Sequence, residues 1–257
     1  MNRDSAELII AALLGKPRHE IYADETNENL DHGLLHARLI QLKNDIPLEY
    51  LTKSVQFRDF DISIEPGVFI PRVETEYLID VIADEITEPP RCVLDIGTGS
   101  GVLAIALARR YPDSRITATD VSHTAIRCAR KNIRTHRLES RIELVRCSLF
   151  DGLIGTFDLI VSNPPYIPSE RLGSLPRSVR DYEPRLALDG GPHGIRVIQR
   201  ILSQAKHYTH ETSLIALEID DNEVSTMRDM LENDRTLSYS LHKDLFGRNR
   251  YCIATFT

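Results

Sequence analysis

The sequence lacks any apolar run long enough to cross a membrane, a span that requires roughly 18 consecutive apolar residues. Its first segment, MNRDSAELII, carries charged residues beside the apolar stretch and has no small-residue cleavage site, so we expect neither a secretory signal nor a transit peptide. Internal repeats and low-complexity tracts are also missing. We therefore expect a cytoplasmic protein without membrane association.

Paired cysteines and an excess of positive charge are missing as well. The four cysteines lie far apart, and neither they nor the nine histidines have the spacing of a metal site. We expect no metal, and we expect buried, reduced thiols at Cys92, Cys128, Cys147 and Cys252. The net charge of −7 disfavours nucleic acid as a direct substrate, although a local basic patch can coexist with an acidic total.

The sequence does contain clear changes of pattern along its 257 residues. Helical periodicity covers residues 5–14 and 30–43, whereas strand-like patterns occupy 55–70 and are interrupted by the turn signal Glu-Pro-Gly at 65–67. A further helix is predicted from 74 to 86. The predicted domains are a helical N-terminal domain for substrate docking (1–53), a β-hairpin linker (54–73) and a main domain (74–257).

In the main domain, strand and helix patterns alternate, which is typical of a doubly wound parallel sheet in an α/β fold. Seven strands are predicted, at 91–96, 115–120, 141–147, 157–162, 213–219, 237–243 and 249–256. Helices are predicted at 101–110, 122–135, 192–207 and 222–232.

A glycine-rich turn follows the first predicted strand, in CVLDIGTGSGVLAIALARR. Gly97, Gly99 and Gly101 let a ligand approach backbone N–H groups at the start of a helix. Asp95 would repel a pyrophosphate, but it suits a ligand with an amino group and a sulfonium, such as S-adenosylmethionine. Asp120, at the end of the second strand, can accept hydrogen bonds from both ribose hydroxyls. The alternatives are a loop-capping role for Asp95 and a helix N-terminal role for Asp120.

The motif NPPY, Asn163 to Tyr166, directly follows the apolar strand FDLIVS. Its prolines, Pro164 and Pro165, remove two backbone donors and stiffen the turn, so the carbonyls of Asn163 and Pro164 can stay unpaired. The Asn163 side-chain oxygen beside one such carbonyl gives two acceptors, which match the two hydrogens of a primary amide or an exocyclic amine. Tyr166 can cover such a planar group by stacking. The alternative is a rigid loop, which does not account for all four residues.

Here the sequence resembles the class I, Rossmann-like methyltransferases that act on planar nitrogens through NPPY, and among them the release factor glutamine methyltransferase family. The segments that resemble this family are IPLEYLTKSVQFRDFDISIEPGVFIPRVETEYLID, EPRLALDGGPHGI and KDLFGRNRYCIATF. Departures lie at Val73, at His193, at Cys147 to Leu149 where an acidic residue contacts adenine in the family, and in LEIDDNEVSTM.

The resemblance implies methyl transfer from S-adenosylmethionine to the side-chain amide N5 of a glutamine, in the GGQ loop of class I peptide chain release factors. A monomer is expected. The cofactor residues would be Asp95, Gly97, Thr98, Gly99, Ser100, Gly101, Asp120, Leu149 and Asn163. The catalytic residues would be Asn163, Pro164, Pro165 and Tyr166.

Three alternatives remain open: a glutamine methyltransferase acting on a ribosomal protein, an adenine-N6 methyltransferase acting on DNA or RNA, and a binding module without catalysis. The adenine enzyme should show a target-recognition domain and a basic face. Two smaller questions also stay open. One is whether the hairpin over the cofactor is ordered by Arg72, Glu74 and Glu76, or whether these residues cap a helix. The other is whether Glu183 forms a loop-ordering ion pair with Arg185, or whether these two residues contact the substrate.

Overall fold

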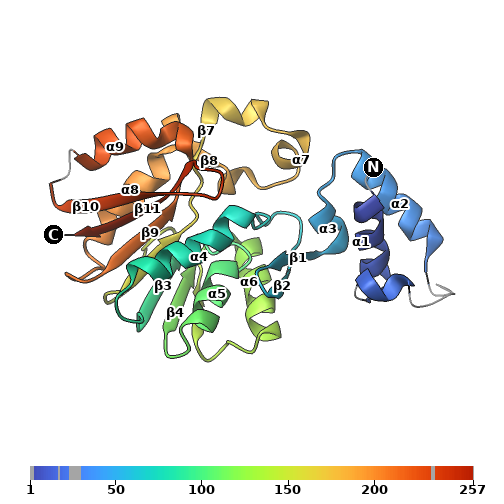
Figure 1. The fold of residues 1–257 in the computed structure, drawn as a ribbon, viewed down its shortest axis with the longest axis horizontal. Helices are drawn as coiled ribbons and strands as arrows, with labels where there is room; N and C mark the ends of the chain where they lie inside the picture. Colours follow the sequence, from blue (N-terminus) through green and yellow to red (C-terminus); the bar gives the residue numbers. More distant parts are fainter. Residues whose placement is uncertain (1–2, 17, 23–29, 233–234, 257) are drawn as a thin grey trace.

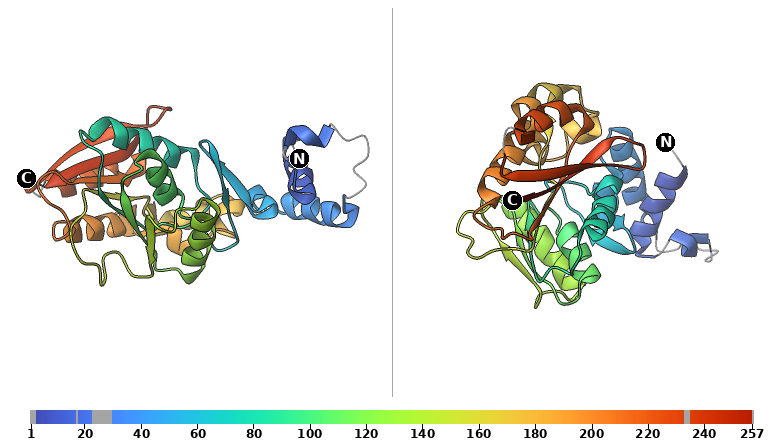
Figure 2. Two further views of the ribbon diagram at one scale, coloured as in Figure 1. Left: turned by 90° about the horizontal axis from the view of Figure 1, so that it is seen from below. Right: turned by 60° about the vertical axis from the view of Figure 1, so that its left-hand side comes forward.

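The computed structural model describes residues 3–16, 18–22, 30–232 and 235–256. A small group of helices at the N-terminal end stands beside a larger α/β body, and a short β-hairpin lies between the two (Figures 1 and 2). Residues 1–2, 17 and 23–29 of the predicted N-terminal domain, and 233–234 and 257 of the predicted main domain, lie outside the described residues.

The N-terminal helices confirm both helical predictions for this part of the chain. The second helix begins at His32, two residues later than predicted, because the Asp31 side chain accepts a hydrogen bond of 2.8 Å from the Leu34 amide, which satisfies a free N–H of the first turn. A third, short helix was not predicted. The elements are α1 (Arg3–Leu14), η1 (Arg18–Tyr22), α2 (His32–Lys43) and α3 (Leu48–Thr52).

The hairpin consists of β1 (Ser54–Phe57) and β2 (Phe60–Ser63), with Phe57 opposite Phe60. The strands are joined at Arg58 and Asp59, so the prediction that the Glu-Pro-Gly turn separates them is wrong; that turn follows β2. Arg58 adopts the left-handed region, with φ of 51°, without the glycine that normally signals such a turn. Phe57 and Phe60 are buried in the core beneath the sheet, so the hairpin packs as part of the α/β body.

The central sheet has seven strands in the order β10-β11-β9-β6-β3-β4-β5, and all seven strand predictions are confirmed to within three residues. Five neighbouring strands run parallel, while β11 lies antiparallel to both β9 and β10. The strands are β3 (Cys92–Ile96), β4 (Arg115–Thr119), β5 (Ile142–Val145), β6 (Leu159–Ser162), β9 (Leu214–Glu218), β10 (Leu237–Lys243) and β11 (Asn249–Phe256).

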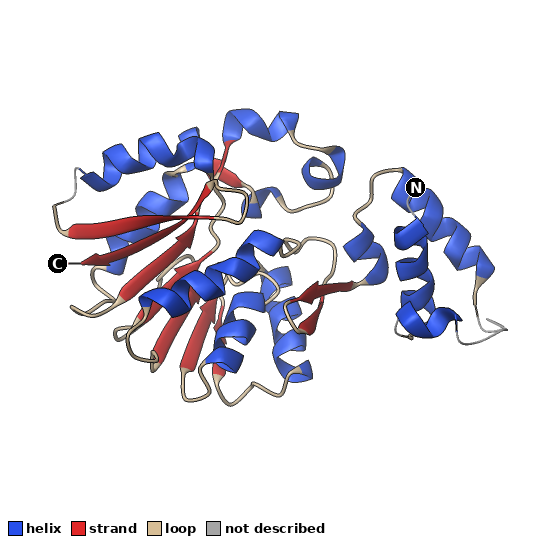
Figure 3. Cartoon of the chain, viewed as in Figure 1, coloured by secondary structure: helices blue, strands red, loops and turns tan. Residues whose placement is uncertain are grey.

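Helices cover both faces of the sheet (Figure 3), and each face has its own apolar core. Alternate residues of one strand serve the two cores: Val93 of β3 belongs to one, and Leu94 and Ile96 belong to the other. One face carries α4 (Val73–Glu85), α5 (Val102–Arg110) and α6 (His123–Thr135), and the other carries α8 (Arg196–Ala205) and α9 (Val224–Glu232).

Two helices begin later than predicted. α8 was expected from 192, but residues 192–194 form a separate turn, η4 (Pro192–Gly194), in which His193 has a left-handed φ of 56°. Likewise η5 (Asp221–Glu223) precedes α9.

The long connection between β6 and α8 holds elements that the sequence did not predict. They are β7 (Ile167–Pro168), η2 (Ser169–Ser174), α7 (Arg177–Arg180), η3 (Arg185–Ala187) and β8 (Asp189–Gly191), and β7 pairs with β8.

The cysteine prediction is only half right. All four are free thiols, and Cys128 and Cys252 are buried, but Cys147 is half-buried and Cys92 is exposed at the first position of β3. Within the described ranges no three potential metal ligands come together, and no helix is long and apolar enough to span a membrane.

Candidate active site

A cavity of about 360 Å³ lies at the carboxyl ends of the parallel strands. It opens where the strand order reverses, since β3 has β4 on one side and β6 on the other, and ligands bind at such points in open α/β sheets. The cavity is lined by the predicted site residues Gly97, Thr98, Gly99, Ser100, Asp120, Leu149, Asn163 and Pro165. Asp95, Gly101, Pro164 and Tyr166 are not among its lining residues.

The glycine-rich loop is open toward the cavity on one side and tightly packed on the other. A Cβ atom added to Gly97 would meet no protein atom within 4 Å. At Gly101, which starts α5 with φ of 86°, an added Cβ would lie 3.2 Å from the Cβ of Ala129 on α6. Only glycine meets both the conformation and the close approach at this position.

Asp95 holds this loop together from inside the protein. It is fully buried, and its Oδ2 accepts hydrogen bonds from the Thr98 hydroxyl at 2.6 Å and from the Ala104 amide at 3.2 Å. Its Oδ1 has no partner within the described chain, and burial raises the pKa of Asp95 to about 7. These contacts agree with the alternative in which Asp95 caps the loop. Direct contact between Asp95 and a ligand stays a prediction.

Asp120 faces the cavity at the end of β4 and also orders the glycine-rich loop. One carboxylate oxygen accepts the Gly99 amide at 2.9 Å, and the other accepts the Ser122 amide at 2.8 Å at the start of α6. Burial raises the pKa of Asp120. Each oxygen keeps a lone pair, so both can accept a further donor from a ligand.

Leu149 also lines the cavity. It has a left-handed φ of 51°, and its carbonyl accepts a weak contact of 3.5 Å from the Thr119 hydroxyl. Val197 and Ile201 of α8 line the cavity together with Leu149, and Arg196 and Arg200 of the same helix line it too, so this part of the cavity has both apolar and charged groups.

Asn163 begins the NPPY motif directly after β6, and its side chain is fixed by residues far away in the sequence. Its Nδ2 donates to the Thr75 hydroxyl at 3.0 Å, and that hydroxyl lies 2.7 Å from Oε2 of Glu218. Glu218 is fully buried, and burial raises its pKa to about 7. No backbone hydrogen bond to the carbonyls of Asn163 and Pro164 is present in the described part of the chain, as predicted.

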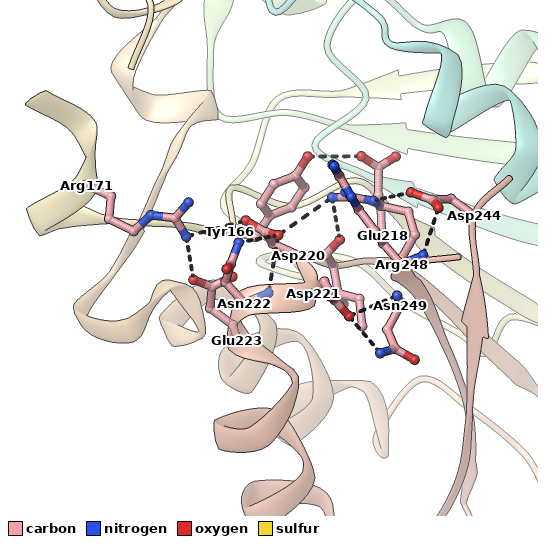
Figure 4. A network of polar contacts seen from close by, with 12 residues as sticks. Tyr166, Arg171, Glu218, Asp220, Asp221, Asn222, Glu223, Asp244, Arg248 and Asn249 are labelled. Atoms are coloured by element: carbon pink, nitrogen blue, oxygen red, sulfur yellow. Dashed lines mark hydrogen bonds and ion pairs between the residues drawn. The ribbon is translucent and has the colours of Figure 1, made fainter. Parts of the chain in front are cut away.

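Tyr166 at the end of the motif also contacts Glu218. Its hydroxyl lies 3.2 Å from Oε1 of Glu218 (Figure 4), and its ring packs partly against the core under α8 and α9. Burial, and to a lesser degree the nearby Glu218 carboxylate, raises the pKa of the Tyr166 hydroxyl well above its usual range. Stacking of Tyr166 on a substrate stays a prediction.

Acidic residues of the segment LEIDDNEVSTM, where the sequence departs from the family, lie next to arginines (Figure 4). Arg171 lies 3.2 Å from Glu223 and 3.6 Å from Asp220. Arg250 lies 4.0 Å from Asp220 and 3.5 Å from Asp244. Asp220 and Glu223 of this segment therefore lie among compensating positive charges close to the NPPY loop.

The predicted ion pair between Glu183 and Arg185 is wrong. Glu183 instead pairs with Arg72 and accepts a hydrogen bond of 3.2 Å from the Ile70 amide, whereas Arg185 pairs with Asp189 at 3.2 Å. The contact with Arg72 ties the loop after NPPY to the segment that leads from the hairpin into α4. Arg72 therefore helps to order this segment, and its side chain makes no cap hydrogen bond at the start of α4. That the hairpin lies over the cofactor stays a prediction.

Glu74 and Glu76 lie in the first turn of α4, where acidic side chains favour the positive end of a helix. Their backbone carbonyls accept hydrogen bonds from the Tyr251 hydroxyl at 2.7 Å and from Arg58 at 2.9 Å.

Thr75 and Glu218 are the site residues that sequence reasoning missed. Glu218 had a detectable signal, because it is the one charged residue in the apolar run LIALEI and a buried acid needs a partner. Thr75 had none, since its role depends on α4 lying next to β9.

The sheet order, with a glycine-rich loop and an NPPY loop at its switch point, defines a class I methyltransferase. The Methyltransferase small domain family matches residues 60–173. A methyltransferase from Pyrococcus furiosus has the same fold, with a TM-score of 0.57 and 20% identity, and the match covers 86% of this chain and 96% of that one.

Sequence relatives give a finer assignment. Release factor glutamine methyltransferase from Rhodopirellula baltica is 34% identical, over 96% of this chain and 87% of that protein. The ribosomal protein uL3 glutamine methyltransferase from Neisseria gonorrhoeae is 39% identical, over 73% of this chain and 62% of that protein. The chain belongs to the release factor glutamine methyltransferase family.

Proposed function

We propose that this protein transfers a methyl group from S-adenosylmethionine to the side-chain amide nitrogen of a glutamine in a protein. The observation that carries this proposal is the arrangement of one cavity, with the glycine-rich loop and Asp120 at one end and Asn163 of the NPPY motif at the other. Membership of the family supports the same conclusion.

The residues present fit S-adenosylmethionine. The open space over Gly97 leaves room for a ligand against the loop backbone, and the unpartnered Oδ1 of Asp95 leaves one buried acceptor available below it. Asp120 would hold the ribose hydroxyls, and the apolar side chain of Leu149 would cover the adenine. When bound, this cofactor supplies a methyl carbon made electrophilic by a sulfonium.

The protein's own contribution is to position a weak nucleophile. An amide nitrogen attacks poorly because its lone pair is delocalised into the carbonyl, and orientation alone can contribute effective molarities of roughly 10⁵ M. The Asn163 side-chain oxygen and the Pro164 carbonyl would accept the two amide hydrogens. These hydrogens become more acidic as charge develops on nitrogen, so the hydrogen bonds strengthen in the transition state and no catalytic base is needed. As the new N–C bond forms, the bond between methyl carbon and sulfur breaks, and the methylated nitrogen then loses one proton to solvent.

The substrate proposed is the glutamine of the GGQ loop in a class I peptide chain release factor, which would give the enzyme a cytoplasmic role in translation termination. A glutamine flanked by glycines can enter a narrow cavity, because its backbone can approach the rim. The N-terminal helices would hold the body of the factor. They contact the loop that follows NPPY through the Tyr182 hydroxyl, 3.0 Å from the Asn44 carbonyl, and through Arg177, 3.5 Å from Asp45.

A ribosomal-protein glutamine is the second candidate, since the uL3 enzyme from Neisseria gonorrhoeae is 39% identical to this chain. Both candidates use the same amide chemistry, so they differ only in the surface that presents the glutamine. A nucleic-acid substrate is disfavoured by the net charge of −7.

The proposal is tested by incubating the purified protein with methyl-labelled S-adenosylmethionine and separate pools of protein, DNA and RNA. We expect label in the protein pool, recovered as methylated glutamine after digestion, and none with Asn163→Ala. Label confined to DNA or RNA would assign the enzyme to the adenine class instead.

A further inference from the structure

Glu218 stands out as a charged residue in the middle of the molecule. It ends β9, it is fully buried, and the mechanism above gives it no role. Its two oxygens contact both ends of the NPPY region. Oε1 lies 3.2 Å from the Tyr166 hydroxyl, and Oε2 lies 2.7 Å from the Thr75 hydroxyl, which in turn lies 3.0 Å from Nδ2 of Asn163.

The direction of these hydrogen bonds follows from the donors available. Above its pKa of about 7, Glu218 is a carboxylate that only accepts, so the single proton of the Thr75 hydroxyl is then donated to Glu218. The Thr75 oxygen can then only accept from Asn163, so the amide nitrogen of Asn163 must face Thr75. The Asn163 side-chain oxygen is therefore left on the other side, where Asn163 lines the cavity.

We propose that Thr75 and Glu218 are positioning residues that fix the Asn163 amide with its oxygen toward the substrate, and that they thereby let the site distinguish glutamine from glutamate. This inference rests on the proposed function. With the oxygen inward, Asn163 accepts from an amide –NH₂ and repels a carboxylate, which has no hydrogen to donate. With the amide flipped, its nitrogen would favour the carboxylate.

The buried setting makes this arrangement rigid. Thr75 is 2% exposed, so its hydroxyl contacts are largely shielded from water. A flip of Asn163 would place two acceptors, its own oxygen and the Thr75 oxygen, face to face. The cost of an unsatisfied buried group opposes such a flip.

The test compares Thr75→Val and Thr75→Ser, using a release factor as substrate and the same factor with its acceptor glutamine replaced by glutamate as competitor. Valine keeps the shape and removes the hydroxyl, whereas serine keeps the hydroxyl. We expect Thr75→Val to lower kcat roughly ten- to hundredfold, with KM and the calorimetric cofactor Kd changed by less than about threefold. Thr75→Ser should stay near wild type.

The competitor supplies a readout that a purely structural role would not change. Wild-type enzyme should bind the glutamate factor much more weakly than the glutamine factor, and Thr75→Val should narrow that ratio because Asn163 can then flip. Glu218→Gln replaces one of the two acceptor oxygens with a donor, so the Thr75 proton is no longer forced toward residue 218, and this variant should narrow the ratio too. Thr135→Val is the matched control, since the Thr135 hydroxyl bonds only the Lys131 carbonyl on the exposed side of α6.

Wild-type kcat and an unchanged glutamine-to-glutamate ratio in both Thr75→Val and Glu218→Gln would overturn the inference. Loss of cofactor affinity or of folding in parallel with kcat, without a change in the ratio, would overturn it as well, because the residues would then be structural. Failure of the proposed function would be seen separately, as absence of glutamine labelling by the wild-type enzyme.

Discussion

The two loops that meet at the cavity are built in different ways. The loop after β3 is ordered by its own neighbourhood: Asp95 bonds Thr98 three residues on, and the glycines supply the turn. The NPPY loop after β6 depends on distant partners, since Asn163 contacts Thr75, 88 residues away. The loop at the cofactor end is thus specified largely by nearby residues, with added support from Asp120 after β4, whereas the loop at the acceptor end depends on a residue 88 positions away.

The largest effect is expected at the acceptor end, from Asn163→Ala. This change removes a hydrogen-bond acceptor that strengthens as charge develops, so turnover should fall about 10²–10³-fold, or roughly 3–4 kcal/mol of transition-state stabilisation. Single-turnover kinetics measure it. Cofactor affinity should hardly change. A mutant with wild-type turnover would exclude Asn163 as an acceptor for the substrate amide.

The next largest effect is expected from Gly194→Ala, which tests the packing around NPPY. Gly194 has φ of 72°, and an added Cβ would lie 2.1 Å from the Tyr166 carbonyl oxygen, so backbone must move. We expect a loss of about 3 kcal/mol in the free energy of unfolding from strain and overlap combined. Gly15→Ala, where φ is 63° and nothing lies within 4 Å, is the control for the conformational part alone. Equal losses of unfolding free energy in the two variants would show that the NPPY loop can shift to accommodate the added methyl group without a cost.

A third prediction concerns pH and the buried carboxylate of the cofactor end. The pKa of Asp95 rises from 3.8 to about 7 in the folded protein, so the folded state keeps a proton that the unfolded chain releases. Its contribution to stability is present at pH 4 and is lost as pH rises toward 7. Urea unfolding at pH 5 and pH 8 should show a fall in stability on the order of 2–3 kcal/mol from this group.

Asp95→Asn cannot titrate, so the variant should show a smaller fall between pH 5 and pH 8 than the wild type. An identical pH dependence in both proteins would mean that Asp95 is ionised throughout and that its burial is compensated.

The smallest effect is expected from Asp120→Ala at the cofactor end. Calorimetry should give cofactor binding weaker by about 1–3 kcal/mol through the loss of charge-assisted hydrogen bonds. The Gly99 amide also loses its acceptor, so part of the effect is disorder of the loop. Unchanged affinity would remove Asp120 from the site.

The sequence predicts features that depend on nearby residues better than features that depend on tertiary packing. Strands and long helices were predictable because periodicity and Pro or Gly breaks are local signals. The turn at Arg58 was missed because a non-glycine residue takes the left-handed conformation there. Another error has a tertiary cause: the Glu183–Arg185 pair was expected from proximity in sequence, but packing brings Arg72 to Glu183.

The site was predictable to the same degree. NPPY and the glycine-rich loop are contiguous motifs, so their residues could be named. The orientation of Asn163 could not, because it depends on α4 bringing Thr75 next to β9.

The most direct test of the account is mass spectrometry of a release factor after incubation with the protein and S-adenosylmethionine. We predict a single added methyl group on the side-chain nitrogen of the GGQ glutamine, and no methylation once that glutamine is replaced. A short peptide with the same loop should react far more slowly, since it lacks the remote contacts of the folded factor. An unmodified GGQ glutamine alongside efficient methylation of adenine in DNA or RNA would contradict the account.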